Sequence, residues 1–262
     1  MARLGTPDPG TPAALELLSA GTVWRLQASI NGYERRSGSS LATQAGAGRH
    51  LRLLDHGAAA RSHERADGAP MGGGRRWVQL LEDGYRCWIN ACDLLGHARA
   101  MPAPRPRILG EDQIRDRLGA VIAWALAART VPNRYLWGGC LGPDFDCSGL
   151  IQAAFANAGV WIPRDAYQQE RFCTPVAVRP GHFGLLRPGD LIFFGRPQRC
   201  THVGLHLEGG RYLHSSGAAH GRDGLGIDSL SPCSDDPVSV HYRTQLRGAG
   251  RLLRSHDGST LP

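Results

Sequence analysis

The sequence predicts an α+β protein with two domains, a small all-β module followed by a larger domain whose helices precede its strands. Short alternating apolar stretches between residues 23 and 97, separated by glycine-rich turns, are typical of strands. From residue 111 apolar residues recur at helical spacing, and after Gly189 the strand pattern returns. Helices followed by strands favour an antiparallel sheet with segregated helices over a repeated strand–helix–strand fold.

Local composition divides the 262 residues into four segments. Residues 1–15 are rich in Pro and Gly, and we expect them to be disordered. Residues 16–97 form the predicted small β-barrel, in which residues 61–74 are a polar, glycine-rich loop. Residues 98–110 carry three prolines and are predicted as a stiff linker, so residues 111–262 form the second domain.

Within the second domain, apolar spacing predicts one long helix and several strands. The helix is expected behind the sheet, with an apolar face made of Ile114, Leu118, Val121, Ile122, Ala125 and Leu126. Alternation predicts strands at 190–194, 203–207, 211–214, 238–240 and 251–253.

Charge and cysteine content narrow the functional classes. The formal charge is +7, but the arginines are scattered singly, with no basic run flanked by aromatic residues, so nucleic-acid binding is not predicted. Seven cysteines without a CxxC pair indicate reduced thiols. The N-terminus lacks the charged head and apolar core of a secretory signal, and no run approaches the ~20 apolar residues of a membrane span. We therefore expect a cytoplasmic protein without a membrane span.

One cysteine is placed for nucleophilic chemistry. Cys147 precedes apolar residues at helical spacing that continue to Gly159, so it begins a predicted helix. The first N–H groups of a helix lack internal partners and carry about +0.5 of charge, which predicts a low thiol pKa. A buried cysteine in a small helix is as often a plain apolar residue, but polar Asp146 and Ser148 favour chemistry.

Two histidines flank a predicted β-hairpin whose turn is Glu208-Gly209-Gly210. If the hairpin centres on Glu208, His202 lies directly opposite His214, with Cβ atoms about 5 Å apart. One imidazole can then take a proton from the cysteine while the other orients it. A slip of one residue would put the rings on opposite faces.

The same cysteines and histidines are also compatible with a zinc site or with structural roles. Cys147, Cys200, His202 and His214 are all zinc-ligand types, but a Cys-x-His spacing is common by chance and no metal or cofactor is predicted. His206 is expected on the solvent side of its strand, and four further histidines are assigned structural roles: His50, His182, His220 and His241. Trp137, Trp161, Phe193 and Phe194 are predicted core residues.

Six motifs then follow one another as they do in the NlpC-type bacterial cell-wall cysteine peptidases, which roughly the last 150 residues resemble. They are Tyr135-x-Trp137-Gly138-Gly139, Asp146-Cys147-Ser148-Gly149-Leu150, Pro163-Arg164-Asp165, Pro188-Gly189-Asp190-Leu191, Thr201-His202-Val203-Gly204 and His214-Ser215-Ser216. The resemblance implies a papain-like fold, in which a helix carrying the cysteine packs on an antiparallel sheet carrying the histidines. It also implies a site with no cofactor.

The same resemblance implies a role for each motif residue. Cys147 is the expected nucleophile, His202 carries the proton and His214 orients His202. Tyr135 is expected to join the Cys147 N–H in holding the oxyanion.

The stretch WVQLLEDGYRCWINACDL, residues 77–94, resembles the last hairpin of a bacterial Src-homology-three-like domain. Family members with this domain cleave between γ-D-glutamate and a diamino acid in murein peptides that carry a free N-terminal L-alanine. The implied partner is such a murein tripeptide or tetrapeptide. The implied contacts to its amine are Asp146, with Glu82, Asp83 and Tyr85 as candidates from an acidic turn of the first domain, which is expected to select substrates.

The carboxylate of the substrate glutamate has its own implied contacts. These are Ser148 and Arg164, the latter on an exposed turn with Asp165, which we also place at the substrate site. Ala166 departs from the family pattern, where relatives offer a serine hydroxyl, and this puts one substrate contact in doubt.

The sequence thus predicts a cysteine endopeptidase that hydrolyses peptidoglycan stem peptides in cell-wall recycling. A non-catalytic module that binds wall fragments is the alternative, which the joint presence of Cys147, His202 and His214 disfavours. An amidase or acyltransferase on a similar fold would keep the chemistry and change the bond.

Overall fold

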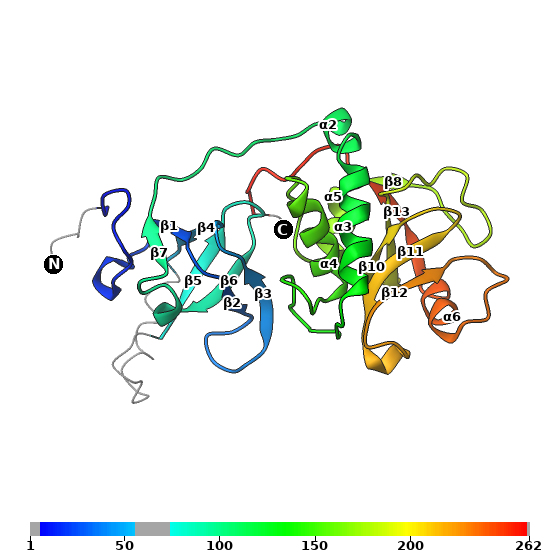
Figure 1. Cartoon of the computed structure of the whole chain (residues 1–262), viewed down its shortest axis with the longest axis horizontal. Helices are drawn as coiled ribbons and strands as arrows, with labels where there is room; N and C mark the ends of the chain where they lie inside the picture. Colours follow the sequence, from blue (N-terminus) through cyan, green and yellow to red (C-terminus); the bar gives the residue numbers. More distant parts are fainter. Residues whose placement is uncertain (1–5, 56–73, 261–262) are drawn as a thin grey trace. The chain divides into compact units, whose positions relative to one another are not determined.

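The computed structural model describes residues 6–55 and 74–260, and it divides the chain into two compact units (Figure 1). The first runs to Pro106 and includes residues 258–260, and the second covers Arg107–Asp257. The predicted loop at 61–74 lies outside the described residues except for Gly74. The predicted α+β class is confirmed. The described residues of the first unit form mainly β-strands, and in the second unit α2, α3, α4 and α5 precede the strands β8 to β13.

The first unit is an antiparallel sheet of seven strands: β1 (Val23–Leu26), β2 (Ile30–Tyr33), β3 (Leu41–Ala45), β4 (His50–Leu53), β5 (Arg75–Leu80), β6 (Arg86–Asn90) and β7 (Ala98–Ala100). Their order is β3-β2-β6-β5-β4-β1-β7. No pair joins β3 to β7 among the described residues, so the pairing does not close the predicted barrel. The predicted hairpin forms β5 and β6, with Trp77 opposite Trp88. The described residues of this unit also include two short 3-10 helices, Leu15–Leu17 and Ala91–Asp93.

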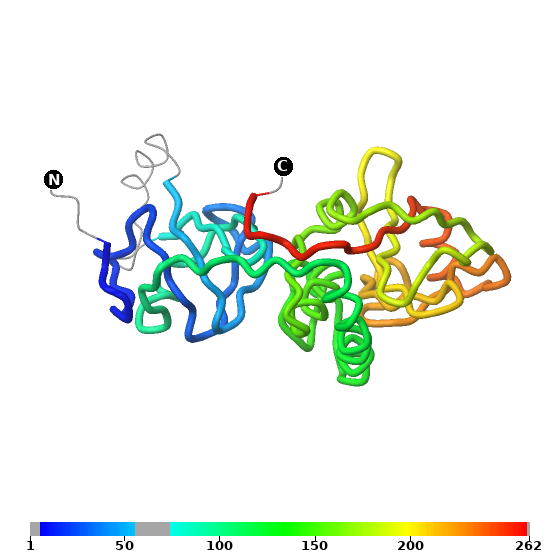
Figure 2. Tube along the Cα trace, turned by 90° about the horizontal axis from the view of Figure 1, so that it is seen from above, coloured from blue at the N-terminus to red at the C-terminus, as the bar shows by residue number. Residues whose placement is uncertain are grey.

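Three predicted boundaries of this unit are wrong. Residues 6–15 are not disordered, because Gly10 and Ala13 donate backbone hydrogen bonds to Ala100 and Ala98. Residues 98–100 belong to β7 instead of the linker, since the β1 strand offers them a free edge. Residues 258–260, at the end of the red segment in Figure 2, belong with the first unit, where Gln79 Nε2 donates to the Gly258 carbonyl at 3.0 Å.

The second unit combines five helices with a sheet of six antiparallel strands. The helices are α2 (Glu111–Arg115), α3 (Leu118–Thr130), α4 (Cys147–Asn157), α5 (Ala166–Phe172) and α6 (Pro237–Arg243), with a 3-10 turn at Ala218–His220. The strands, in sheet order, are β12 (Gly224–Ser229), β11 (Arg211–Ser216), β10 (Arg199–His206), β9 (Leu191–Arg196), β13 (Leu246–Arg251) and β8 (Thr174–Val176).

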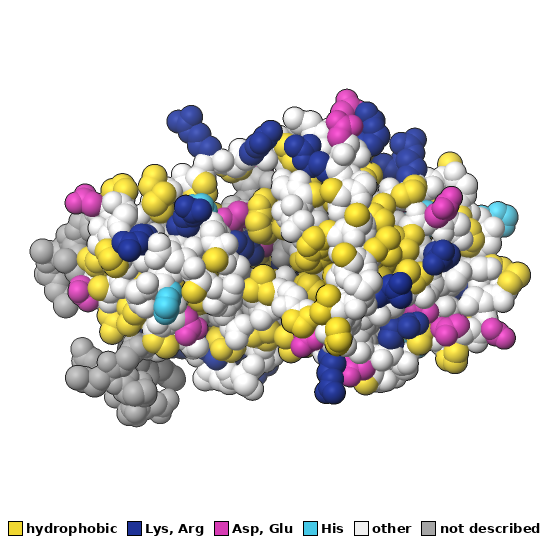
Figure 3. All heavy atoms as spheres, in the orientation of Figure 1, with side chains coloured by type: hydrophobic (Ala, Val, Ile, Leu, Met, Phe, Trp, Pro, Cys, Tyr) yellow, Lys and Arg dark blue, Asp and Glu magenta, His cyan; other side chains and the backbone are white. Residues whose placement is uncertain are grey.

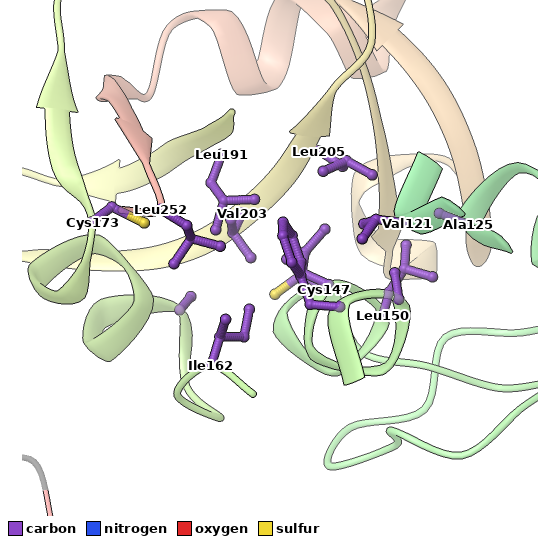
Figure 4. Packing of buried hydrophobic residues seen from close by; sticks show 14 of the residues in the cluster. Val121, Ala125, Cys147, Leu150, Ile162, Cys173, Leu191, Val203, Leu205 and Leu252 are labelled. Atoms are coloured by element: carbon purple, nitrogen blue, oxygen red, sulfur yellow. The ribbon is translucent and has the colours of Figure 1, made fainter. Parts of the chain in front are cut away.

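Each face of this sheet carries its own apolar core. On one face α4 and α5 pack against β10, and the core there includes Leu150, Val203 and Leu205. Figure 4 shows Cys147 in this cluster, between the start of α4 and the strand that carries Val203. On the other face Phe194 and the α6 residue Tyr242 belong to a second core. Alternation along each strand decides which face a side chain joins.

Three predicted elements of this unit differ from the structure. Residues 238–240 lie in α6, because Asp236 accepts hydrogen bonds from the Val238 and Ser239 N–H groups and Pro237 occupies the first turn. These start signals outweigh the strand preference of valine. The predicted helix at 114–126 is split between α2 and α3, and α3 packs on α4. The last strand ends at Arg251, so residues 252–253 lie beyond it.

Candidate active site

Cys147 is the first residue of α4, as predicted. The Asp146 carboxylate caps the helix by accepting the Gly149 N–H at 2.6 Å, and it also accepts the Gly138 N–H at 2.9 Å. A Cβ at Gly149 would clash with the Gly139 carbonyl, so the loop before the helix closes against it only because this position is glycine. The glycine-punctuated approach therefore fixes the place of the sulfur.

Arg164 is paired with Asp146 inside the domain. Its guanidinium donates to the two Asp146 oxygens at 3.0 and 2.6 Å, and to Ser148 Oγ at 3.0 Å. Only 1% of Arg164 is exposed, so its expected position on an exposed turn is wrong. A buried guanidinium needs a carboxylate partner, and that requirement brings the two motifs together. The predicted contacts of Asp146, Ser148 and Arg164 with substrate stay predictions.

Asp165 caps α5 rather than standing free. The Gln168 N–H donates to the Asp165 carbonyl at 3.0 Å, and the Gln168 side chain accepts the Asp165 N–H at 3.5 Å. Asp165 therefore forms the start of α5.

The predicted low pKa of Cys147 is wrong. Burial raises the pKa of the thiol to about 12, and the Asp146 carboxylate adds to the increase. The N–H groups of Val203 and Ser148, together with the Arg164 charge, oppose it only in part. The helix start that stabilises a thiolate is here closed off from water, and desolvation outweighs the dipole.

His202 and His214 meet on one face of the sheet. His202 Nε2 lies 2.7 Å from His214 Nδ1. Strand β10 pairs Leu205 with Leu213, and continuing this register places Gly204, two residues beyond His202, opposite His214. The predicted direct pairing is therefore wrong, but the offset of two residues keeps both rings on the same face.

A carboxylate on the neighbouring strand completes the relay. His214 Nε2 lies 2.6 Å from Asp228 Oδ2, so His214 donates its Nε2 proton there. His214 Nδ1 must then accept the proton of His202 Nε2, which leaves a lone pair on His202 Nδ1. Asp228 thus sets both tautomers and leaves His202 able to act as a base.

The charges of the relay follow from its burial. Burial and the neighbouring His214, His220 and His241 lower the pKa of His202 well below its usual value. Burial also lowers the pKa of His214, against the pull of Asp228. Burial alone would raise the pKa of Asp228, but the His214 hydrogen bond and the Arg222 charge lower it. The resting site therefore holds two neutral imidazoles beside a carboxylate.

Asp228 is the functional residue that sequence reasoning missed. Arg222 Nη2 donates to both of its oxygens at 2.8 Å, and Ser239 Oγ donates to Oδ1 at 3.0 Å. A lone acid in an otherwise apolar and small-residue strand, at the position opposite Tyr212, was the available signal. Without the β11–β12 pairing nothing connected it to His214.

Tyr242 of α6 packs directly on His202. Its ring stacks on His202 with centroids 4.1 Å apart and planes 20° from parallel. Its hydroxyl bonds Ser216 Oγ at 2.8 Å. Because residues 238–240 alternate as a strand does, no feature of the sequence predicts Tyr242 at this position.

Residues 132–238 match the model of the NlpC/P60 family. This segment is an NlpC/P60 domain. Residues 33–94 match a second model, the bacterial dipeptidyl-peptidase Sh3 domain, and both predicted resemblances are thereby confirmed.

Several curated proteins and solved structures are similar to part of this chain. The chain is 40% identical over 84 residues to a gamma-D-glutamyl-L-lysine dipeptidyl-peptidase of Bacillus subtilis, which covers 31% of this chain and 27% of that protein. It is 36% identical over 106 residues to peptidoglycan endopeptidase RipB of Mycobacterium tuberculosis, covering 39% of this chain and 40% of that one. A solved structure of RipD from Mycobacterium tuberculosis is 30% identical, with a TM-score of 0.39, and the match covers 52% of this chain and 98% of that one. RipD is described as a non-catalytic NlpC/p60 domain protein adapted to peptidoglycan binding. The chain thus spans well under half the length of these two curated relatives.

Tyr135 of the NlpC/P60 domain lies near the nucleophile, as its predicted role requires. After burial, the Cys147 charge is the largest contribution that raises the pKa of Tyr135, and it also raises that of Tyr242, which reaches about 12. Both hydroxyls therefore stay protonated and can donate. Trp137, two residues on, is 63% exposed, so its assignment to the core is wrong.

Two histidine assignments in the NlpC/P60 domain also change. His206 is buried, with Nδ1 at 2.9 Å from the Arg187 carbonyl, so it does not lie on a solvent face. His220 and His241 stack with centroids 4.4 Å apart, next to Tyr242, so they do have a context that singles them out.

The acids of the predicted Sh3 turn are already paired within their own unit. Glu82 contacts Arg49 Nε at 3.1 Å and accepts the His50 N–H at 2.7 Å. Asp83 is buried and lies 2.9 Å from Arg49 Nη2. The turn is therefore not a free acidic loop, and the predicted amine contacts of Glu82, Asp83 and half-buried Tyr85 stay predictions.

Residues 6–55 and 74–260 contain no group of three or more His, Cys, Asp or Glu side chains placed to hold a metal ion. Within the same residues no helix has the length and apolar character needed to cross a membrane.

The raised pKa of Cys147 gives a first testable prediction. We expect iodoacetamide to alkylate Cys147 slowly at neutral pH, with a rate that rises about tenfold per pH unit, because the thiolate is scarce below its pKa. Exposed Cys92 and Cys233 are internal references and should react first at neutral pH. Peptide mapping of alkylated cysteines across the pH range measures both rates. Fast alkylation of Cys147 that is already constant under mildly acidic conditions would show a resting thiolate instead.

Proposed function

We propose that this chain is a cysteine endopeptidase that hydrolyses peptidoglycan stem peptides. The observation that supports this most is the relay that runs from His202 through His214 to Asp228 and leaves a lone pair on His202 Nδ1. The next residue after His202 is Val203, whose N–H bonds the Cys147 sulfur. Acyl transfer by a thiol needs this base, and a structural cysteine does not.

The proposed reaction starts from a neutral thiol and a neutral imidazole. His202 takes the Cys147 proton as the sulfur attacks the scissile carbonyl, and His214 with Asp228 stabilises the resulting imidazolium. Tyr135 and the Cys147 N–H donate to the oxyanion. His202 then gives this proton to the leaving amine as the C–N bond breaks. In the second half His202 takes a proton from the water that attacks the acyl-enzyme, and it returns the proton to the Cys147 sulfur as the C–S bond breaks.

The finer part of the proposal concerns the bond and the setting. We propose cleavage between γ-D-glutamate and a diamino acid, in peptides with a free N-terminal L-alanine, during cell-wall recycling. The relative from Bacillus subtilis that is named for γ-D-glutamyl-L-lysine peptides supports the bond. The cytoplasmic location stays a prediction.

Product analysis tests the activity and the bond together. After incubation with L-Ala-γ-D-Glu-diaminopimelate, mass spectrometry should detect L-Ala-γ-D-Glu and free diaminopimelate. Release of free alanine would place the cleavage at the alanine–glutamate bond and would contradict the proposed bond. If the peptide stays intact but binds to the protein saturably, the result would favour the non-catalytic module.

Acetylation of the alanine amine tests substrate selection. We expect kcat/KM to fall at least about tenfold for the N-acetyl peptide, because a buried ammonium contact worth a few kcal/mol is lost. Tyr85→Phe removes only a hydroxyl. If the first domain takes part in selection, this variant should show a smaller difference in kcat/KM between the free and the N-acetyl peptide. Equal rates on the free and acetylated peptides in the unmodified protein would contradict selection by the amine.

A further inference from the structure

A groove of about 600 Å³ lies along β12, the edge strand of the second unit's sheet. Three arginines from separate elements line it: Arg129 from α3, Arg211 from β11 and Arg222 from the loop before β12. In the region that Figure 1 labels β12, Figure 3 shows basic and acidic side chains close together. No step of the proposed hydrolysis uses Arg129 or Arg211.

The acids of the groove are already occupied. Asp228 accepts from His214 and from Arg222, and Asp236 accepts the Val238 and Ser239 N–H groups at the start of α6. Within the described part of the chain, Arg129 and Arg211 make no side-chain ion pair. Three arginines against two acids leave a formal excess of 3 − 2 = +1 along this wall.

Arg222 reaches both the groove and the relay. Its Nη2 is held by the two Asp228 oxygens, while its Nε is buried and has no hydrogen-bond partner among the described residues. Leaving a buried guanidinium N–H unpaired is costly, typically by a kcal/mol or more. The Arg222 side chain as a whole is 27% exposed, so a ligand in the groove contacts its exposed part while Asp228 holds Nη2.

The strand edge adds a backbone donor at the same place. Along β12 every second N–H group points away from β11, toward the groove side of the strand. Of these, the Leu225 N–H donates to Asn133 Oδ1 at 2.8 Å and the Ser229 N–H donates to Ser239 Oγ at 3.1 Å. Ile227 lies between them with the same orientation, and its N–H has no partner in residues 6–55 and 74–260. The groove thus presents charged and backbone donors, with its acceptors used.

We propose that this groove binds an oxyanionic group, a phosphate or a carboxylate, through Arg129, Arg211, the exposed part of Arg222 and the Ile227 N–H. Planar guanidinium groups and a backbone N–H suit either oxyanion, because both offer several acceptor oxygens. The occupant shares Arg222 with Asp228 and so binds next to the relay without touching Cys147.

Binding of simple anions to the full chain tests the site without reference to hydrolysis. Pyrophosphate and succinate are the probes, titrated separately by calorimetry at near-physiological salt, where diffuse attraction to exposed charges is screened. We expect saturable binding of at least one probe, and the one that binds more tightly identifies the oxyanion. The same titration followed by amide NMR should shift the Ile227 resonance.

Charge-matched variants place the ligand. Arg129→Gln and Arg211→Gln should each weaken binding, and the double variant should weaken it at least about tenfold, as expected for the loss of two charge-assisted contacts. Arg179→Gln removes one exposed charge of the same unit outside the groove, and it should leave the affinity unchanged. The proposal is overturned if neither probe binds saturably, if the double variant binds as well as the unmodified chain, or if the Ile227 amide does not respond.

Discussion

Replacing Cys147 by serine should lower kcat/KM by at least about a thousandfold, because a hydroxyl is far harder to deprotonate than a thiol for the same imidazole base. Cys147 is buried and touches the Val203 and Ser148 N–H groups, which a serine oxygen of similar size can also bond. The melting temperature should therefore change little. The measurements are steady-state hydrolysis of a defined muropeptide and thermal unfolding of the same preparation.

Cys173→Ser is the matched control for this variant. Cys173 is 6% exposed, the same fraction as Cys147, and belongs to the same apolar cluster. It should keep kcat/KM within about twofold, since no group of the relay contacts it. Loss of activity in Cys173→Ser with retention in Cys147→Ser would show that the nucleophile has been misassigned.

Substitutions along the relay should reduce activity in a graded order. His202→Ala removes the base and should cost at least about a thousandfold in kcat. His214→Ala should leave more activity, because it removes only the group that orients His202 at 2.7 Å. Asp228→Asn should cost about ten- to a hundredfold, because it removes the charge that fixes the tautomers and stabilises the imidazolium.

The pH profile separates a role in catalysis from a role in folding. Because the pKa of His202 is lowered, the unmodified protein should keep its activity until the pH falls below the usual histidine value, where protonation removes the base. Asp228→Asn should lower kcat with little change in KM, and it should move this acid limb to lower pH, since a positive relay is less stabilised without the carboxylate. Full activity in both His202→Ala and His214→Ala would show that the hairpin has a structural role and no part in catalysis.

The motifs and their local structure could be read from the sequence. Cys147 begins α4, as the helical spacing after it indicates, because a periodicity of a few residues encodes a single element. The hairpin that carries His202 and His214 was also found, although its register was not, because a three-residue turn permits more than one pairing.

Errors occurred where a local pattern was ambiguous. Residues 238–240 alternate as a strand does, but Asp236 and Pro237 begin a helix there and bring Tyr242 onto His202. The edge strand β7 was assigned to a linker because three residues beside prolines carry little signal.

By itself, the sequence determined the α+β class, the resemblance to the NlpC/P60 domain, the position of Cys147 at the start of a helix and the hairpin that carries the two histidines, since each depends on residue types at short spacings. The tertiary structure alone decided the protonation states, because the pKa of Cys147 follows from its removal from water. It also decided that Arg164 pairs with Asp146 and that Asp228 completes the relay. These contacts join residues 18 and 14 positions apart on separate elements. Long-range packing and desolvation bring such residues together, and neither leaves a periodic trace in the chain.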